Sequence, residues 1–237
     1  MLRIEGMAIE RGTGSHSYRV ALPALTLKRG EVAAITGPSG CGKSTLLEMI
    51  GLILTPDQLH IFTLGDTTAV NVAGFLQRDE QAPLADLRAH RLGFVLQTGG
   101  LLPFLTVRQN IELPRRINGL ARHSELVNDA IARLDLGYLL DKRPGQLSIG
   151  ERQRVAFVRA IAHQPDLLLA DEPTAALDPF QARRLFELII DMVQRFQIAA
   201  LLVTHDWDLV RDCSIRNIAG VADDNGNNQG TVFHDAA

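Results

Sequence analysis

A glycine-rich segment early in the chain has the residue types and the spacing of a loop that holds phosphate groups. It runs from Gly37 to Thr45 and satisfies the pattern G-x-x-x-x-G-K-[S/T]. Glycines let the backbone come close to a ligand and turn successive N–H groups toward phosphate oxygens, which a Cβ atom would prevent. Lys43 follows the last of these glycines. The segment therefore predicts a site for a nucleoside triphosphate.

The residues of this loop have separate expected roles. The Lys43 ammonium would reach the β- and γ-phosphates, the Ser44 hydroxyl would ligate Mg²⁺, and Thr45 would assist at the α- and β-phosphates. A helix that begins here would add the partial positive charge of its N-terminus. The expected nucleotide-binding residues of the loop are Gly37, Pro38, Ser39, Gly40, Cys41, Gly42, Lys43, Ser44 and Thr45.

Two adjacent carboxylates form a second group that could do chemistry. Asp171 and Glu172 follow the apolar residues 167–170 and precede Pro173. One carboxylate at such a strand end can hold Mg²⁺, directly or through water, and the other can orient or deprotonate an attacking water molecule. The residues alone leave open which of the two faces the metal.

Ser148 and Gly150 lie at the expected start of a helix over residues 150–163. The Ser148 side chain is a plausible N-cap for this helix. The same arrangement would also make a second anion site, because the N–H groups of a helix N-terminus attract negative charge. Both interpretations fit these two residues.

The elements that must position these groups can be recognised from apolar patterns. Residues 32–36 form a short β-branched run before the phosphate loop, and residues 43–50 after it have helical spacing. Residues 167–170 and 199–203 are continuously apolar, as buried parallel strands are, and an amphipathic helix over 179–196 separates them. The core is therefore expected to be wound β-α-β.

The other segments predict strands and helices around this core. Residues 2–9 and 18–27 alternate between apolar and polar side chains, which indicates an antiparallel entry sheet with Gly12, Gly14 and Ser15 in its turn. The remaining expected elements are a helix within 78–91, a strand over 92–96, helices over 107–113, 124–134 and 150–163, and a terminal hairpin that joins 218–221 to 231–233 through Asn225 and Gly226.

Composition and charge narrow the class of protein. The 24 Lys and Arg residues against 27 Asp and Glu lack the basic bias of a nucleic-acid binder, so no nucleic-acid partner is expected. The two cysteines, Cys41 and Cys213, suggest neither a disulfide framework nor a zinc site. Apolar runs are shorter than the roughly 18 residues that a membrane span needs, so a membrane role would come through a partner.

Taken in order, these motifs resemble those of the ABC ATPase family. The resemblance is carried by residues 147–155, which read LSIGERQRV, by the helix that follows, and by the run LLLADEP over residues 167–173. It implies an α/β P-loop NTPase core, mainly a parallel sheet flanked by helices, with an antiparallel β entry subdomain and a helical subdomain. A single ABC ATPase domain over residues 1–237 is expected, with the helical signature subdomain at approximately 98–163.

The resemblance also implies roles for individual residues. Asp171 would hold Mg²⁺ and Glu172 would act on the attacking water. Gln97 would contact Mg²⁺ or that water, and His205 would lie at the γ-phosphate. The implied catalytic residues are Glu172, His205, Gln97 and Lys43, and the implied metal ligands are Ser44, Gln97 and Asp171.

In the family, the anion site at Ser148 and Gly150 contacts the γ-phosphate bound to another subunit, and Asp178 matches the aspartate that crosses the dimer interface. The resemblance thus implies a dimer, either of this chain or with a similar ATPase subunit, around two ATP molecules. The implied cofactors are ATP and Mg²⁺.

Four positions depart from the family pattern or have two interpretations. Ile149 stands where the family usually has glycine, and Glu151 where glutamine is commoner. Tyr18 is either ordinary strand packing or an adenine contact, a role that the Arg11 guanidinium could also fill by stacking. Cys41 is either a small residue that fits a tight loop or a thiol made reactive by the helix N-terminus and Lys43.

Within the family, residues 92–97 and 101–114 resemble the ATPases of lipoprotein release, of macrolide efflux and of the FtsE type. That branch implies export or mechanical work directed at the cell envelope, with transmembrane permease subunits as partners. The chain would then lie at the cytoplasmic face of the inner membrane, held there by those partners. Residues 101–114, with the charge of Glu112, would form the partner's socket or would merely fill the helical lobe.

Two other classes of function remain open at this stage. A soluble ABC ATPase that acts on ribosomes or DNA would usually carry tandem cassettes or long coiled-coil insertions, and neither is seen. A nucleotide-gated binding module with low turnover could dispense with a general base, which Glu172 argues against.

Overall fold

A computed structural model of the chain describes residues 1–12, 17–65, 69–223 and 229–236. The strands are β1 (Leu2–Arg11), β2 (Tyr18–Leu27), β3 (Val32–Thr36), β4 (Ile61–Leu64), β5 (Val70–Asn71), β6 (Leu92–Val95), β7 (Leu167–Asp171), β8 (Ala199–Val203), β9 (Arg216–Asp223) and β10 (Gln229–Asp235). The helices are α1 (Lys43–Ile50), α2 (Val72–Gln77), α3 (Gln81–Arg91), α4 (Val107–Ile117), α5 (Glu125–Arg133), α6 (Ile149–Ile161), α7 (Pro179–Arg195) and α8 (Trp207–Asp212).

The strands join into one sheet in the order β5-β4-β1-β2-β10-β9-β3-β8-β7-β6. From β9 to β6 all neighbours are parallel, whereas β5, β4, β1 and β2 pair antiparallel. Strand β10 connects the two parts, because it runs parallel to β2 and antiparallel to β9. The expected parallel core, entry sheet and terminal hairpin are therefore all present, as parts of one continuous sheet.

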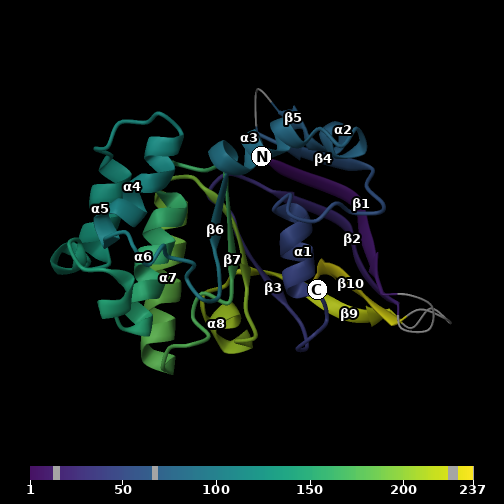
Figure 1. Cartoon of the computed structure of the whole chain (residues 1–237). Helices are drawn as coiled ribbons and strands as arrows, with labels where there is room; N and C mark the ends of the chain where they lie inside the picture. The colour runs from purple at the N-terminus through teal and green to yellow at the C-terminus, as the bar shows by residue number, and fades with distance from the viewer. Residues whose placement is uncertain (13–16, 66–68, 224–228, 237) are drawn as a thin grey trace.

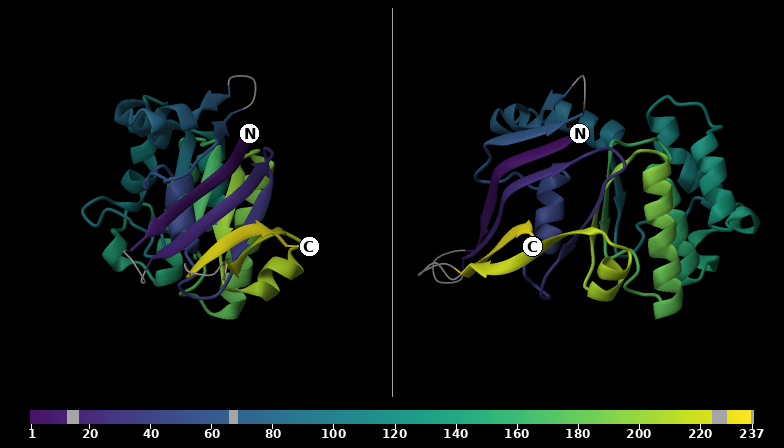
Figure 2. Two further views of the ribbon diagram at one scale, coloured as in Figure 1. Left: turned by 90° about the vertical axis from the view of Figure 1, so that its right-hand side faces the viewer. Right: turned by 180° about the vertical axis from the view of Figure 1, so that it is seen from behind.

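The helices lie on different sides of this sheet. Figures 1 and 2 show β1, β2 and β4 to one side of the parallel strands and α4, α5, α6 and α7 to the other. Helix α1 contacts β2, β7 and β8, so it packs against strands of both parts of the sheet. Helix α6 contacts β6 and α7, and α4 and α5 contact α6. Helices α4, α5 and α6 fall within residues 98–163, and that they form a separate subdomain stays a prediction.

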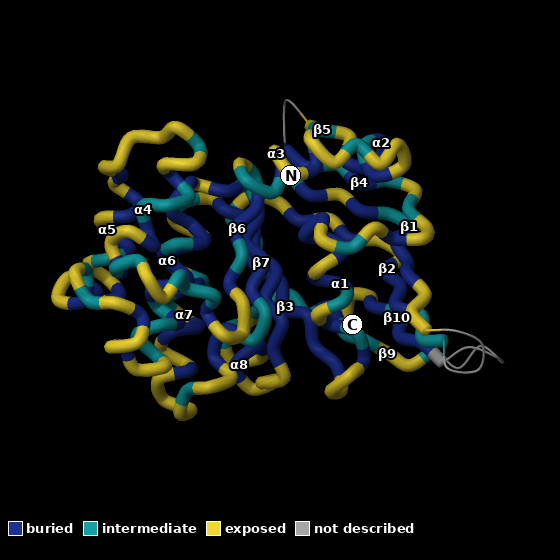
Figure 3. The backbone as a smooth tube through the Cα atoms, viewed as in Figure 1, coloured by how far each residue is buried: buried dark blue, intermediate teal, exposed yellow. Residues whose placement is uncertain are grey.

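The central strands are buried on both faces, and successive residues belong to two different cores (Figure 3). In β7, Leu167 and Leu169 join the core that includes α1, whereas Leu168 and Ala170 join the core that includes α6 and α7. Side chains alternate between the two faces of a strand, so a strand covered on both faces must be apolar at every position. This explains the uninterrupted apolar runs of the sequence.

Several boundaries differ from the sequence-based expectation. Helix α4 ends at Ile117 and not at Leu113, so it continues one turn beyond Pro114. Arg115 fixes that turn, because its buried guanidinium donates to the Ala162 carbonyl oxygen at 2.7 Å and to two loop carbonyls. The short elements β4, β5, α2 and α8 were not expected at all. The predicted turn residues Gly14, Ser15, Asn225 and Gly226 lie outside the described residues.

Close packing of α6 against β6 leads to a stability prediction. A Cβ atom built on Gly93 would lie 2.3 Å from the carbonyl oxygen of Ala160, and backbone atoms of a packed helix cannot easily move away. We expect Gly93→Ala to destabilise the fold by about 1–3 kcal/mol, as overpacked cores do. Gly137→Ala is the control, because a Cβ there has no neighbour within 4 Å. Equal melting temperatures for the two variants would contradict this close approach of α6 to β6.

Candidate functional site

The phosphate loop connects β3 to α1, which is the context that its sequence predicted. Gly40 and Gly42 have φ angles of +76° and +93°, in the left-handed region that favours glycine. A Cβ atom on Gly42 would also lie 2.4 Å from Cγ2 of Val20 in β2. At Gly42 the loop thus requires glycine both for its backbone angle and for its packing.

Helix α1 begins without a side-chain cap, because its N-cap residue is Gly42. The N–H groups of its first turn are therefore the kind of uncapped donors that bind an anion. The Lys43 side chain is only 6% exposed and donates from Nζ to the carbonyl oxygens of Gly37 at 2.9 Å and Pro38 at 2.8 Å. Ser44 is exposed beside it. The loop thus gathers a cation, a hydroxyl and free backbone donors.

The structure supports the simpler interpretation of Cys41. Its side chain is 7% exposed and belongs to the core that includes α1. Its Sγ atom also lies against Gly37, where an added Cβ would come within 2.8 Å of it. A buried thiol is poorly placed to react with a solute, so Cys41 serves as a small packing residue.

Three of the predicted catalytic residues meet at the carboxyl ends of neighbouring parallel strands. Gln97 follows β6, Glu172 follows β7 and His205 follows β8. Gln97 Nε2 donates to Glu172 Oε2 at 3.2 Å, and His205 Nδ1 lies 3.1 Å from Glu172 Oε1. The Glu172 carboxylate is thereby held between an amide and an imidazole, an arrangement that can orient a base toward a water molecule.

Glu172 also has an unusual backbone conformation. Its φ angle is +48°, which is uncommon for a residue with a side chain and costs free energy. The conformation is fixed on both sides: the Glu172 N–H donates to the Val203 carbonyl at 3.0 Å, and its carbonyl accepts from the Ala175 N–H at 3.2 Å. Such strain is typical of functional residues, and here it places the carboxylate between Gln97 and His205.

The predicted metal ligands offer a hydroxyl, an amide and a carboxylate, from Ser44, Gln97 and Asp171. Asp171 is the last residue of β7 and is half-buried beside Val203 of β8. Among the described residues, no group of three or more His, Cys, Asp or Glu side chains could hold a metal on its own. Such a donor set of few oxygens fits Mg²⁺, which keeps several waters and binds mainly through one or two carboxylates and substrate phosphates.

Ser148 is the N-cap of α6, as expected. Its Oγ atom accepts from the Glu151 N–H at 3.2 Å, and the Glu151 carboxylate accepts from the Ser148 N–H at 2.7 Å. Tyr138 donates its hydroxyl to the same carboxylate at 2.9 Å. Glutamate at position 151 is therefore explained by this reciprocal cap, and the Ser148 hydroxyl proton remains free to donate to an anion.

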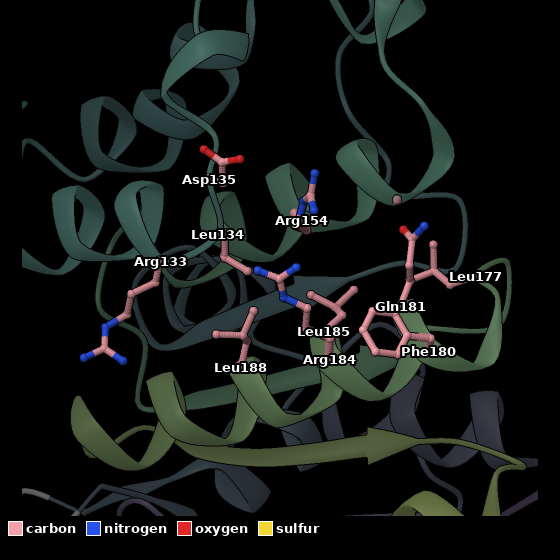
Figure 4. A pocket seen from close by; sticks show the side chains of 11 residues that line it. Arg133, Leu134, Asp135, Arg154, Leu177, Phe180, Gln181, Arg184, Leu185 and Leu188 are labelled. Atoms are coloured by element: carbon pink, nitrogen blue, oxygen red, sulfur yellow. The ribbon is translucent and has the colours of Figure 1, made fainter.

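The segments around Gly150 and Asp178 meet at one cavity of about 380 Å³. Gly150 lines it from α6, Leu177 lines it from the turn before α7, and Phe180 and Gln181 line it from the start of α7 (Figure 4). Ile149 presents an exposed side chain next to Gly150 and is not packed over the N-terminus of α6. The start of α6 and the start of α7 therefore lie at one open face of the molecule.

Asp178 caps α7 by accepting from the N–H groups of Phe180 and Gln181, both at 3.1 Å. A capping role alone accounts for this residue in the single chain. Its predicted contact across a dimer interface stays a prediction.

Tyr18 has the role of a packing residue. Its hydroxyl forms a 2.6 Å hydrogen bond with Thr231 Oγ1 of β10, and its ring packs against the core that includes α1. The exposed Arg11 lies opposite Tyr18 in the register of β1 and β2. Arg11 therefore remains the candidate for stacking on a base.

Sequence reasoning missed two residues that contact the loop of Gln97. Gln153 and Arg159, both on α6, hydrogen-bond the loop that carries Gln97. Both fall within or just after the motif LSIGERQRV, but that motif does not show which loop they contact. The fold was needed to reveal the contact.

The sequence matches the family described as "ABC transporter" over residues 23–175. The lipoprotein-releasing system ATP-binding protein LolD 1 of Rhodospirillum rubrum is 44% identical over 190 residues, which are 79% of this chain and 80% of that protein. LolD of Cereibacter sphaeroides is 38% identical over 213 residues, or 88% of this chain and 92% of that protein.

Two solved structures resemble the fold. The ATP-binding cassette MJ0796, a dimer bound to ADP and Pi in a post-hydrolysis state, has a TM-score of 0.74 and 30% identity, covering 92% of this chain and 94% of that one. CbiO1 of Clostridium perfringens, part of the ABC transporter complex cbiONQ, has a TM-score of 0.74 and 27% identity, covering 92% and 83%.

The reciprocal cap of α6 leads to a prediction about pH. The hydrogen bond from the Ser148 N–H lowers the pKa of Glu151 below its ordinary value, and the Tyr138 hydroxyl adds to the effect. Because the pKa is lower in the folded state, the stabilisation is present above the unfolded-state pKa and is lost as the pH falls through the folded value. We expect Glu151→Gln to lower the melting temperature at about pH 7 and to have less effect near about pH 4.

Melting curves of the wild type and the variant at both pH values test this expectation, with the exposed Glu48→Gln as the control. A difference between wild type and Glu151→Gln that is independent of pH would contradict a charge-dependent cap.

Proposed function

The chain belongs to the ABC transporter family, and we propose that it is the ATP-hydrolysing subunit of a transport complex whose transmembrane subunits are separate chains. Members of this family hydrolyse ATP. The sequence and the fold of this chain match those of transporter ATP-binding subunits. Within the described residues, no helix is both long and apolar enough to cross a membrane.

The observation that carries this proposal is the contact of Glu172 with Gln97 and His205. Glu172 would take a proton from the attacking water, and the two neighbours would hold its carboxylate in place. Lys43 and the N–H groups of α1 would bind the phosphates and stabilise the charge that develops on them. When bound at Ser44, Asp171 and Gln97, Mg²⁺ would neutralise phosphate charge. The products are ADP and inorganic phosphate.

We propose that two such subunits enclose two ATP molecules. Ser148 keeps a hydroxyl proton that it could donate to an anion at the N-terminus of α6. The phosphate loop of the same chain precedes a different helix, α1, whose N-terminus would bind that chain's own phosphates. A second copy, or a similar ATPase subunit, would supply that anion as its γ-phosphate. The dimeric state of MJ0796 supports this assembly.

The membrane partner's docking site would be an apolar cleft of about 340 Å³ between β6 and α4. From the expected socket over residues 101–114, Leu102, Leu113 and Pro114 line this cleft, and Ile117 extends the lining along α4. Glu112 lines a different cavity, beside Arg108, so its charge does not belong to this cleft. Leu101 packs against the core that includes α6, which supports a filling role for that residue.

The named relatives support a place in the lipoprotein-releasing branch. We infer that the chain drives work directed at the cell envelope, from the cytoplasmic face of the inner membrane, where permease subunits would hold it. A soluble ABC ATPase that acts on ribosomes or DNA lacks such support. A nucleotide-gated binding module with low turnover is disfavoured, because the contacts of Glu172 with Gln97 and His205 would orient it as a base.

The role of Glu172 is tested by Glu172→Gln, which keeps the shape of the side chain but cannot accept a proton. We expect ATP turnover to fall by about 10²- to 10⁴-fold while ATP binding is retained. Steady-state hydrolysis and equilibrium nucleotide binding measure the two effects separately. Turnover within about twofold of the wild type would refute the assignment of the base.

Assembly is tested in the same Glu172→Gln background by sedimentation with and without ATP. We expect ATP to convert monomer to dimer, and the added Ser148→Arg to prevent this by filling the anion site with a bulky side chain. Ser148→Thr is the control, because a hydroxyl cap is kept. Monomer in every sample, or a dimer that tolerates the arginine, would contradict an assembly through this site.

A further inference from the structure

Helix α6 holds the loop that carries Gln97 through two side chains. Gln153 Nε2 donates to the Gln97 carbonyl at 2.6 Å. Arg159 donates to the Gly100 carbonyl at 2.6 Å and to the Gly99 carbonyl at 3.2 Å. Three carbonyls of one short loop therefore accept from a single helix.

Helical geometry explains how one face of α6 reaches all three carbonyls. Residues three apart on a helix are neighbours on its surface, so Ala156 lies between Gln153 and Arg159 on the side that contacts the loop. A Cβ atom on Gly99 would lie 3.6 Å from Cβ of Ala156, which is ordinary contact between the loop and the middle of this face. The small Ala156 lets the loop approach, and the two longer residues bond it at both ends.

The loop itself has a shape that presents its carbonyls to α6. Gly99 and Gly100 have φ angles of +76° and +58°, and the Gly99 N–H donates to the Leu96 carbonyl at 2.8 Å. A Cβ atom on Gly100 would come within 3.0 Å of Leu96 and 3.4 Å of the Arg159 guanidinium. The turn is thus closed on itself and bonded to the helix that it contacts.

A role in packing alone does not explain a glutamine at position 153. The residue is 3% exposed, and within the described part of the chain its Oε1 atom has no hydrogen-bond partner. A buried polar atom without a partner costs free energy, which an apolar side chain of the same size would avoid. The donated bond to Gln97 is the contact that such an apolar side chain would lose.

We propose that Gln153 and Arg159 are positioning residues, which make the Gln97 loop move with α6. The start of α6 carries Ser148 and Gly150, and the loop places the Gln97 amide on Glu172. A shift of α6 when its N-terminus meets a nucleotide therefore changes the contact between Gln97 and Glu172. This inference rests on the proposed function, because it requires α6 to face the ATP of a second subunit.

The test is a double-mutant cycle between Gln153→Met and Gln97→Ala, read as ATP turnover of the full chain. We expect Gln153→Met to lower kcat about 10-fold, since misplacing a group that orients the base is costly. The KM for ATP should change by less than about twofold, because the phosphate loop is untouched. In the Gln97→Ala background the same substitution should change kcat by less than about twofold, because there is no longer a side chain to position.

Val158→Ala is the matched control, since Val158 is fully buried on α6 but makes no bond to the loop. It should lower the melting temperature and leave kcat unchanged. If Gln153→Met does not fold, Arg159→Lys takes its place in the cycle, because lysine lacks the fork that reaches two carbonyls.

A kcat unchanged by Gln153→Met, or a loss that is equally large with and without Gln97, would overturn the positioning role. If either result is found while Glu172→Gln shows the expected loss of ATP turnover, the proposed ATPase function remains intact. A wild-type chain that binds but does not hydrolyse ATP would remove both proposals.

Discussion

The site depends on the parallel pairing of β7 between β6 and β8. This pairing brings three strand ends to one edge of the sheet, and the residues that follow them are Gln97, Glu172 and His205. The hydrogen bond from the Glu172 N–H to the Val203 carbonyl extends the pairing one residue beyond β7 and fixes a left-handed backbone there. A slip of one residue in this register would turn each side chain to the other face of the sheet. The contact between the carboxylate, the amide and the imidazole would then be lost.

The two cores keep this register in place. Because successive side chains of β7 and β8 enter different cores, a displaced strand would disturb packing on both faces at once. Helix α1 covers one face and carries the phosphate loop, whereas α6 covers the other and holds the Gln97 loop. Lys43 is thus carried by the helix on one face of the sheet, and the Gln97 loop is bonded to the helix on the other. A relative movement of the layers is the natural way to change the distance between them.

Much of this arrangement could be predicted from the sequence, for identifiable reasons. The β3–loop–α1 unit and the strands β7 and β8 have strong local signals, namely glycines at fixed spacing and runs that are apolar at every position. The N-cap role of Ser148 was likewise predicted from the residues around it. By contrast, β4 and β5 are short and gain their stability from pairing with β1 and with each other, which no local pattern encodes. The continuation of α4 past Pro114 depends on Arg115 bonds to distant carbonyls. The contacts of Gln153 and Arg159 also join segments more than fifty residues apart, so only the fold could reveal them.

The capping of three helices explains why one chain would need two kinds of anion contact. Helices α6 and α7 are capped by their own side chains, Ser148 and Asp178, which already satisfy part of their N-terminal N–H groups. Helix α1 has Gly42 at its N-cap and no such side chain, so its first turn depends on an external acceptor. A phosphate chain enclosed by the α1 loop therefore satisfies donors that the protein leaves unpaired. At α6 an anion would gain a hydroxyl proton and the field of a helix that is already capped. The first contact would bind the nucleotide within one chain, and the second would close reversibly on the nucleotide of another chain, as an ATP-driven assembly requires.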